Sequence, residues 1–415
     1  MDQRRASVTR NRDFWLLLSG QAVSFVGDQA QFFALPLVVL AISGSPTQAG
    51  VVMGLSTVSF LAFGVVAGAL VDRWDRKTTM IWCEAGRAVL VGSVVAAMAV
   101  GALGLPHLYL VSIVSGALTT LFQSANSAAL PNVVGADQLS TALGYTETVN
   151  NTVRVFGATA AGAMYALGRV VPFAVNAVSF AVSAVTLRFM RVEFQDKRTD
   201  ERPSKLIKEI GAGLDWVWRR PVIRFLTLIS AADNIRYGAG YLVIVVLAQG
   251  LGASALEIGV IFSAAAVGAL LGALVSDRVT KRFPLGRIAV VMLWVEALGF
   301  PLYAVAPNPL VLAVIAAVES LVAPVYSVAM STYRLAITPD ELRGRATSAV
   351  STVTTGALSI GTILGGFLLT ALGAHVLVLV LGGWMVCLAV LTTVNRTVRR
   401  APIAGQVGES VVVEG

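Results

Sequence analysis

Four charged residues lie inside long apolar stretches of the sequence: Asp28, Asp233, Arg236 and Glu319. A charge at the centre of a bilayer costs at least ~2.5 kcal/mol, so such a residue usually faces a cavity or an oppositely charged partner. Asp28 and Glu319 have no basic neighbour in their own stretches, which suits carboxyl groups that exchange protons; cavity polarity or packing is the alternative. Asp233 and Arg236 are spaced i, i+3 and can meet on one helix face, so a structural ion pair is the alternative for both.

Other polar residues in apolar stretches are candidates for binding or structural roles. Arg154 can pair with a carboxylate from the first helix or receive an anionic substrate group. Glu84 and Arg87, also spaced i, i+3, are interpreted as structural or gating charges, and Glu296 has no assigned role. Neutral side chains that can donate hydrogen bonds into an apolar pocket, or between helices, are Gln31, Asn234 and Tyr237.

The elements that hold these residues are expected to be transmembrane helices. The chain is 56% hydrophobic and 13% charged, whereas a soluble domain is roughly 25% charged. A helix that crosses a ~30 Å hydrocarbon core needs ~20 mostly apolar residues. The sequence therefore predicts an all-α membrane protein with twelve transmembrane helices, near 14–42, 48–71, 78–102, 107–131, 141–166 and 170–190, then 222–249, 255–276, 286–305, 308–333, 345–371 and 374–395.

The longest polar stretch divides the chain into halves. Residues 1–190 are expected to form an N-terminal six-helix bundle and residues 222–395 a C-terminal one. Between them, 191–221 reads as a cytoplasmic linker, either with an amphipathic surface helix or as a solvated connector. Residues 396–415 are expected to be a cytoplasmic tail.

Lys and Arg concentrate on one side of the predicted bundle. In the loops of the opposite side, Arg169 is the only basic residue. This asymmetry places both termini in the cytoplasm by the positive-inside rule. The net charge of +8 is then explained by topology, and no nucleic-acid partner is expected. The basic side comprises the N-terminus, 72–77, the linker, 277–287, 334–345 and the tail.

The two halves also share sequence. Asp28 and Asp233 are 205 residues apart, and so are Asp72 and Asp277. Gly68-Ala69-Leu70-Val71 recurs 204 residues later as Gly-Ala-Leu-Val beginning at Gly272. Several matches at nearly one offset indicate a duplication. The two bundles are therefore expected to be pseudo-symmetric.

The segment from Gly68 to Lys77, GALVDRWDRK, resembles the cytoplasmic loop motif G-x-x-x-D-R-x-G-R-[RK] of the major facilitator superfamily. It departs at Asp75, where the motif usually has Gly, so an Asx-type bond is expected to hold the turn. A small Gly68 would allow a close helix approach. A solvated loop that only sets topology is the alternative. The resemblance implies a conformational switch at Gly68, Asp72, Arg73 and Arg76, with Asp277 and Arg278 in the second half.

Nearly the whole chain is similar to the drug-efflux branch of that superfamily, which includes macrolide-efflux proteins, siderophore exporters and transmembrane secretion effectors. The antiporter sequence Gly-Pro-x-x-Gly-Gly is degenerate here, since the segment 157–162 lacks the Pro and one Gly. The segments that carry the resemblance are Phe14 to Pro36, Ala129 to Pro131, Asn176 to Phe180, Val217 to Pro221 and Leu342 to Arg345.

This resemblance implies an exporter of hydrophobic or amphipathic small molecules, driven by proton antiport and needing no cofactor beyond the proton gradient. It implies a monomer among the lipids of a bacterial inner membrane, with helices 1, 4, 7 and 10 around a cavity. The candidates for proton coupling are then Asp28, Glu319 and Asp233, and those for the substrate cavity are Arg236, Arg154, Asn234, Tyr237 and Gln31.

Three other functions stay open at this point. The chain could be a dedicated exporter of one siderophore or other secondary metabolite. It could also be a lipid scramblase or a membrane enzyme. The sequence contains no P-loop, HExxH or GxSxG motif and only two His residues, so an enzyme is not expected.

Overall fold

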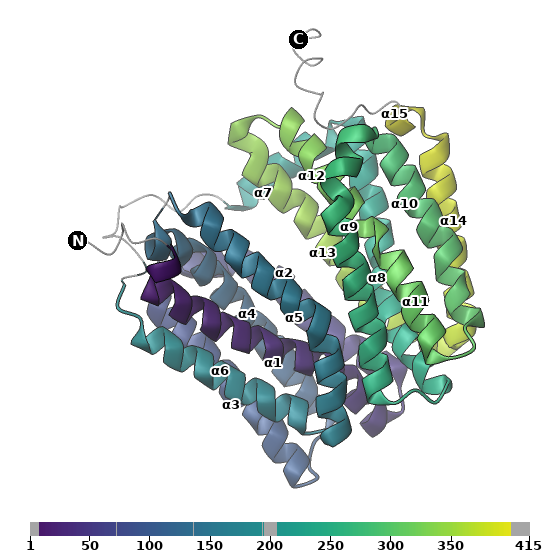
Figure 1. The fold of residues 1–415 in the computed structure, drawn as a ribbon. Coiled ribbons are helices and arrows are strands. Elements are labelled where there is room, and N and C mark those ends of the chain that lie inside the picture. Colours follow the sequence, from purple (N-terminus) through teal and green to yellow (C-terminus); the bar gives the residue numbers. More distant parts are fainter. Residues whose placement is uncertain (1–7, 72, 136, 193, 195–205, 400–415) are drawn as a thin grey trace. The chain divides into compact units, whose positions relative to one another are not determined.

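A computed structural model describes residues 8–399, except 72, 136, 193 and 195–205. The chain divides into two compact units, Met1–Pro203 and Ser204–Gly415 (Figure 1). In the part that the structure describes, the regular elements are all helices. The predicted switch residue Asp72 and the tail beyond Arg399 lie outside the described residues.

Unit 1 contains six long helices. α1 packs against α5 and α6, α2 packs against α4, and α3 packs against both α4 and α6. Asn11 caps α1, and Gly44 ends it with a left-handed backbone conformation at φ 63°, which glycine adopts without steric cost. The helices are α1 (Arg12–Ser43), α2 (Pro46–Val71), α3 (Arg76–Ala99), α4 (Leu105–Val134), α5 (Leu139–Leu167) and α6 (Val171–Phe189), preceded by the short 3₁₀ helix η2 (Val8–Arg10).

Unit 2 begins with α7 (Leu206–Trp218), which packs against α13. Part of the predicted linker, Leu206–Trp218, is thus helical, and this helix packs on its own unit. The largest contact in this unit joins α8 and α13. The remaining elements are α8 (Pro221–Gly250), α9 (Ala255–Arg282), α10 (Leu285–Gly299), the 3₁₀ helix η3 (Phe300–Val305), α11 (Pro309–Ser320), α12 (Val322–Ile337), α13 (Asp340–Leu372), α14 (Ala374–Val394) and α15 (Arg396–Arg399).

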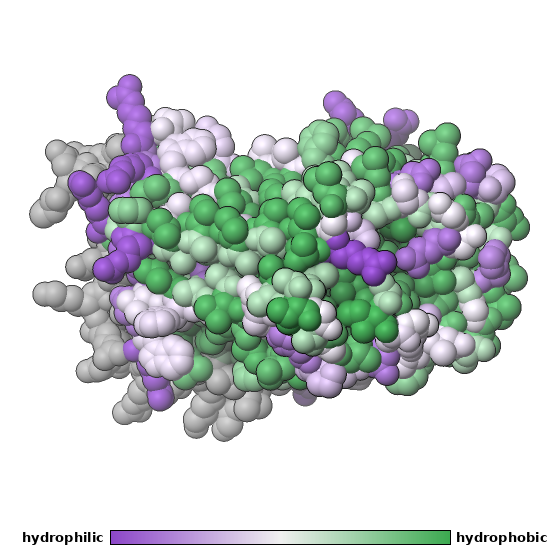
Figure 2. All heavy atoms as spheres, turned by 90° about the horizontal axis from the view of Figure 1, so that it is seen from below, coloured by the Kyte–Doolittle hydropathy of each residue, from purple (hydrophilic) through white to green (hydrophobic). Residues whose placement is uncertain are grey.

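Ten helical segments in the described part of the chain are long and apolar enough to cross a membrane. The long helices α5 and α8 are not among the ten; both contain charged residues, such as Arg154 and Asp233. Hydrophobic side chains cover much of the visible face in Figure 2. This surface fits a lipid environment, and each unit supplies six membrane-length passes when α10 is joined to η3 and α11 to α12.

Two passes of unit 2 are interrupted at prolines. α11 ends at Ser320 and α12 starts at Val322, two residues before Pro324, which therefore lies in the first turn of α12. α10 likewise ends at Gly299, two residues before Pro301. Proline has no N–H and its ring clashes with the carbonyl four residues earlier, so neither helix can continue regularly through these points. The sequence prediction treated each pass as one helix.

Two predicted loops are partly helical. Asp277 and Arg278 were expected in a 277–287 loop, but α9 continues to Arg282. Charged residues do not end a helix by themselves, and here Pro284 sets the boundary. In the same way α13 begins at Asp340, inside the expected 334–345 loop. Acidic residues in the first turn favour that early start because they interact well with the helix dipole.

Glycines allow the closest helix contacts in unit 2. A Cβ built on Gly361 of α13 would lie 2.1 Å from the carbonyl oxygen of Ile235 on α8, and one on Gly365 would lie 2.5 Å from Cα of Ala239. α13 therefore packs closely against α8 at both glycines. At Gly68, by contrast, no heavy atom of the described residues beyond its own stretch of helix lies within 4 Å of such a Cβ, whereas at Gly272 the carbonyl oxygen of Leu321 lies 2.0 Å away.

Candidate functional site

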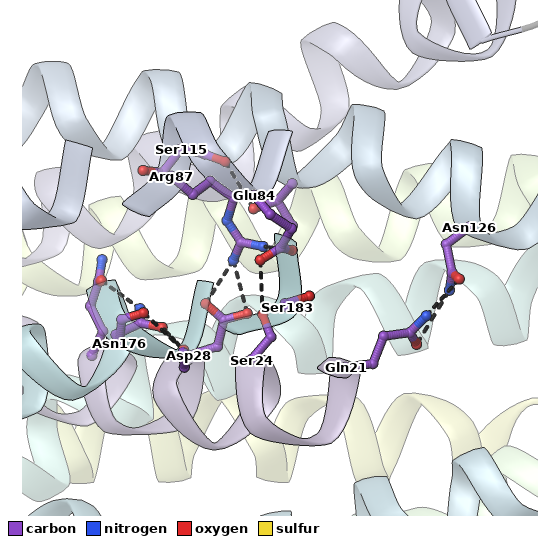
Figure 3. A network of polar contacts seen from close by, with 12 residues as sticks. Gln21, Ser24, Asp28, Glu84, Arg87, Ser115, Asn126, Asn176 and Ser183 are labelled. Atoms are coloured by element: carbon purple, nitrogen blue, oxygen red, sulfur yellow. Dashed lines mark hydrogen bonds and ion pairs between the residues drawn. The ribbon is translucent and has the colours of Figure 1, made fainter. Parts of the chain in front are cut away.

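Unit 1 contains a buried polar cluster formed by Ser24 and Asp28 of α1 with Glu84 and Arg87 of α3 (Figure 3). We call it the unit 1 cluster. Nη2 of Arg87 donates to both carboxylate oxygens of Asp28, at 2.7 and 2.8 Å. Nη1 donates to Oε1 of Glu84 at 3.3 Å, and the Ser24 hydroxyl donates to the other Glu84 oxygen at 3.4 Å.

The surroundings of the unit 1 cluster are mostly apolar. The guanidinium carbon of Arg87 lies 3.8 Å from the ring centroid of Phe180 on α6, within cation–π range. The Glu84 side chain is fully buried, while that of Asp28 is 37% exposed. Of the three charged side chains in this cluster, that of Asp28 is therefore the one accessible from outside it.

Hydrogen-bonded amides extend from the unit 1 cluster along α1. Nδ2 of Asn176 on α6 donates to Oε1 of Gln31 at 2.7 Å, and Gln21 pairs with Asn126 of α4. Gly27 lets α6 approach, since a Cβ there would lie 2.8 Å from Cα of Asn176. The predicted cavity residue Gln31 thus holds two helices together in this structure.

Unit 2 contains a second cluster, centred on Arg236 of α8. Its Nε donates to Oδ1 of Asp233 at 2.9 Å, and its Nη1 donates to Oε1 of Glu319 on α11 at 2.8 Å. Its Nη2 lies 3.6 Å from Oε2 of Glu296 on α10. We call Asp233, Arg236, Glu296 and Glu319 the unit 2 cluster. Three helices therefore contribute charges to one point.

The unit 2 cluster is more deeply buried than the unit 1 cluster. Its most exposed side chain, Asp233, is 13% exposed, and Glu296 is 2% exposed. The guanidinium carbon of Arg236 lies 5.1 Å from the ring centroid of Phe300. Tyr303 is a hydrogen-bonding partner of Glu319. Within the described part of the chain, no donor hydrogen-bonds to Oε2 of Glu296.

The structure corrects the sequence interpretation of the carboxyl groups. Asp28 and Glu319 lack a basic neighbour along their own helices, but each pairs with an arginine across the bundle. Glu296, for which the sequence suggested no role, belongs to the unit 2 cluster. Its signal was a charged residue in an apolar helix. The sequence did not show that this side of α10 faces Arg236.

The other predicted cavity residues are Arg154 on α5 and, beside the unit 2 cluster on α8, Asn234 and Tyr237. Arg154 is exposed on α5 and takes no part in the ion pairs of the described residues; the guanidinium on Asp28 is that of Arg87. Nδ2 of Asn234 donates to the carbonyl of Ser230 in its own helix at 2.8 Å. The Tyr237 side chain is 64% exposed.

The loop motif of unit 1 forms defined contacts. Oδ1 of Asp75 accepts from the Thr78 amide at 2.7 Å and caps α3, as the predicted Asx-type bond requires. Arg76 donates to the carbonyl of Ala128 at 2.9 Å, and Lys77 donates to that of Met190 at 2.6 Å. These contacts tie the start of α3 to the ends of α4 and α6. In unit 2, Asp277 pairs with the exposed Lys281 at 2.7 Å, and Arg278 is exposed.

Two six-helix units with charged clusters inside apolar helices define a multi-pass membrane transporter rather than an enzyme. The family model of the Major Facilitator Superfamily matches residues 17–232 and 225–412. The chain therefore belongs to the Major Facilitator Superfamily, and the predicted fold of twelve helices in two bundles is confirmed.

Named relatives agree with this assignment. The chain is 26% identical over 412 residues to the multidrug efflux pump Tap of Mycolicibacterium fortuitum, covering 96% of this chain and 99% of Tap. It is 28% identical over 211 residues to the uncharacterized MFS-type transporter YfiS of Bacillus subtilis, covering 50% of this chain and 49% of YfiS. Among solved structures, the nucleoside transporter NupG has the same fold, with a TM-score of 0.77 at 12% identity over 94% of this chain and 99% of NupG.

Proposed function

We propose that this transporter exports hydrophobic or amphipathic small molecules, antibiotics among them, from a bacterial cytoplasm in exchange for protons. One observation carries the proton part: in each unit the clustered carboxyl groups outnumber the guanidinium that binds them. The similarity to Tap over nearly the whole of both chains supports the substrate class.

The excess of carboxyl groups gives protons a place to bind. Two carboxyl groups meet one guanidinium in the unit 1 cluster, and three meet one in the unit 2 cluster. Uncompensated charge in an apolar interior is costly, and a bound proton removes it. A proton that binds one conformation better than another shifts the population between them. Antiport follows if substrate favours the deprotonated arrangement.

The proposal assigns a role to each candidate residue. Asp28, Asp233 and Glu319 exchange protons while their arginine partners hold them. Exposed Asp28 is the member of the unit 1 cluster that a substrate or proton reaches first. Arg236, Arg154, Asn234, Tyr237 and Gln31 contact substrate in the conformations that bind it.

The proposed setting completes this function. The transporter works as a monomer in the bacterial plasma membrane, with lipid around it and both termini in the cytoplasm, since Lys and Arg concentrate on that side. Alternating access at a site near the membrane midplane carries the substrate across. No cofactor is involved beyond the proton gradient.

Transport by the purified protein in lipid vesicles tests this proposal. Ethidium, tetracycline and erythromycin serve as probes, and an imposed pH gradient is expected to drive each transported probe against its own gradient. Collapse of the pH gradient with an ionophore should stop this uphill movement, while protein-free vesicles control for leak. If no member of a wide antibiotic panel moves in response to the pH gradient, the proposal is wrong.

A further inference from the structure

We propose that Glu296 of α10 is a proton-binding site of this transporter, holding its proton within the unit 2 cluster. This inference rests on the proposed proton antiport and adds Glu296 to the carboxyl groups that bind protons in unit 2. Glu296 lies outside the carboxyl groups that the sequence suggested for this role.

The charges around Arg236 require at least one bound proton or another cation. If all four groups of the unit 2 cluster were ionised, three negative charges would surround one positive charge. The side chains are between 2% and 13% exposed, so water can compensate little of that excess. Uncompensated ions in such surroundings are strongly unfavourable, and neutralisation by a proton is the usual outcome.

Hydrogen-bond donors distinguish the three carboxyl groups. Asp233 accepts from Nε of Arg236 at 2.9 Å, and Glu319 accepts from Nη1 at 2.8 Å. Glu319 also has the Tyr303 hydroxyl as a partner. Oε2 of Glu296 lies 3.6 Å from Nη2 and is buried, and no donor of the described residues hydrogen-bonds to it. Glu296 is therefore the carboxyl group least stabilised as an anion.

Contact between two carboxyl groups points to the same residue. The side chains of Glu296 and Asp233 lie within hydrogen-bonding reach of each other. Two carboxylates cannot share a hydrogen bond unless one of them carries a proton, because an ionised carboxylate has no donor. Asp233 already accepts from Arg236, so a protonated Glu296 that donates to Asp233 satisfies both groups.

The groups that face Glu296 come from three other elements. Asp233 and Arg236 approach from α8, Glu319 from α11, and Tyr326 from α12. Among these, only Arg236 is positively charged. A change at any of them alters proton binding at Glu296, so release is coupled to movement of α8 or α11. When Arg236 approaches Glu296, the anion is stabilised and the proton leaves.

Infrared spectroscopy tests the bound proton without any substrate. The full-length protein in lipid vesicles is expected to show the carbonyl-stretch band of a protonated carboxyl group at neutral pH. The nearly isosteric Glu296→Gln should lose that band, and Glu296→Asp, which keeps a carboxyl group, should shift it. Glu341→Gln is the matched control, because Glu341 is exposed at the start of α13. A band that is unchanged in Glu296→Gln overturns the proposal.

Transport tests the role of that proton. With ethidium as the probe, Glu296→Gln should lose uphill movement driven by a pH gradient but keep downhill exchange of ethidium across the membrane. A purely structural role would reduce both together. Equal gradient-driven transport by Glu296→Gln and the wild type overturns the inference about Glu296. Failure of the wild type to respond to the gradient would instead contradict the proposed antiport, and the infrared result would still decide whether Glu296 binds a proton.

Discussion

Both units hold charged side chains among apolar helices, but they do so with different residues. In each, an arginine on one helix binds a carboxylate on another, close to an Asp that both halves share. The arginine of unit 1 comes from the third long helix, α3, whereas that of unit 2 comes from the first long helix of its bundle, α8. Among the charged residues of the two clusters, only Asp28 and Asp233 occupy matching positions in the two halves.

Matched positions make the divergence explicit. At the offset of 205 that aligns the two Asp residues, Arg236 corresponds to Gln31 and Glu296 to Val91. In the other direction, Arg87 corresponds to Met292. The two halves therefore share an Asp on their first long helix, while the charged residues that surround it stand at different positions in each half. The clusters now differ in burial and in the ratio of carboxyl groups to guanidinium.

Removal of the arginines should give the largest difference between the units. Arg236→Met leaves three buried carboxyl groups without a cation, and we expect it to lower the free energy of unfolding by ~3–5 kcal/mol. Arg87→Met should cost less, because the 37% exposed Asp28 can be solvated. Denaturant titration in detergent micelles measures both, with the exposed Arg343→Met as the control. Equal losses for Arg236 and Arg87 would mean that burial does not separate the clusters.

Glycine substitutions test the helix contacts that hold each cluster. Gly361→Ala would place a methyl group 2.1 Å from a backbone oxygen of α8, and overpacking of this kind costs about 1–3 kcal/mol. Gly27→Ala should cost somewhat less, since its two nearest contacts are side-chain oxygens of Ser179 and Asn176, and the backbone contact, Cα of Asn176, is longer at 2.8 Å. Gly68→Ala meets open space and should stay within ~0.5 kcal/mol. The same micelle titration ranks the three variants. A large loss at Gly68 would show a close contact there in another conformation.

Neutralised carboxyl groups should give the smallest effects, and of opposite sign. Asp28→Asn weakens the two-oxygen ion pair with Arg87 and should cost about 0.5 kcal/mol, a small value because Asp28 is partly exposed. Glu319→Gln removes one of the carboxyl groups that compete for the single guanidinium of Arg236 and should be neutral or slightly stabilising. Thermal unfolding in micelles measures both. Destabilisation by Glu319→Gln well beyond that of Asp28→Asn would contradict the excess of negative charge in unit 2.

Much of the fold could be predicted from the sequence because lipid imposes long apolar runs. The ends of α1 and α14 agree with the prediction to within two residues. Errors occurred where a charge was taken as a helix end, as at Asp277, or where a proline interrupted an apolar run, as at Pro324. Neither changes the number of passes.

The site was predicted only in part, for a physical reason. Spacing within one helix identified the pairs Asp233 with Arg236 and Glu84 with Arg87, and both exist. The ion pair between Asp28 and Arg87 joins residues 59 positions apart, and it depends on how α1 and α3 are rotated against each other. A single sequence contains no direct record of that rotation. Glu296 was left without a role for the same reason.

The interruption of the helix after Glu319 has a mechanical consequence. Pro324 has no N–H, so bending at Leu321 breaks no hydrogen bond that Pro324 would otherwise make. α11 and α12 are therefore two short helices connected at Leu321, and α11 can tilt without moving α12. Leu321, where the helix is interrupted, is two residues from Glu319, whose carboxylate pairs with Arg236. A small tilt of α11 would therefore break or re-form the ion pair between Glu319 and Arg236.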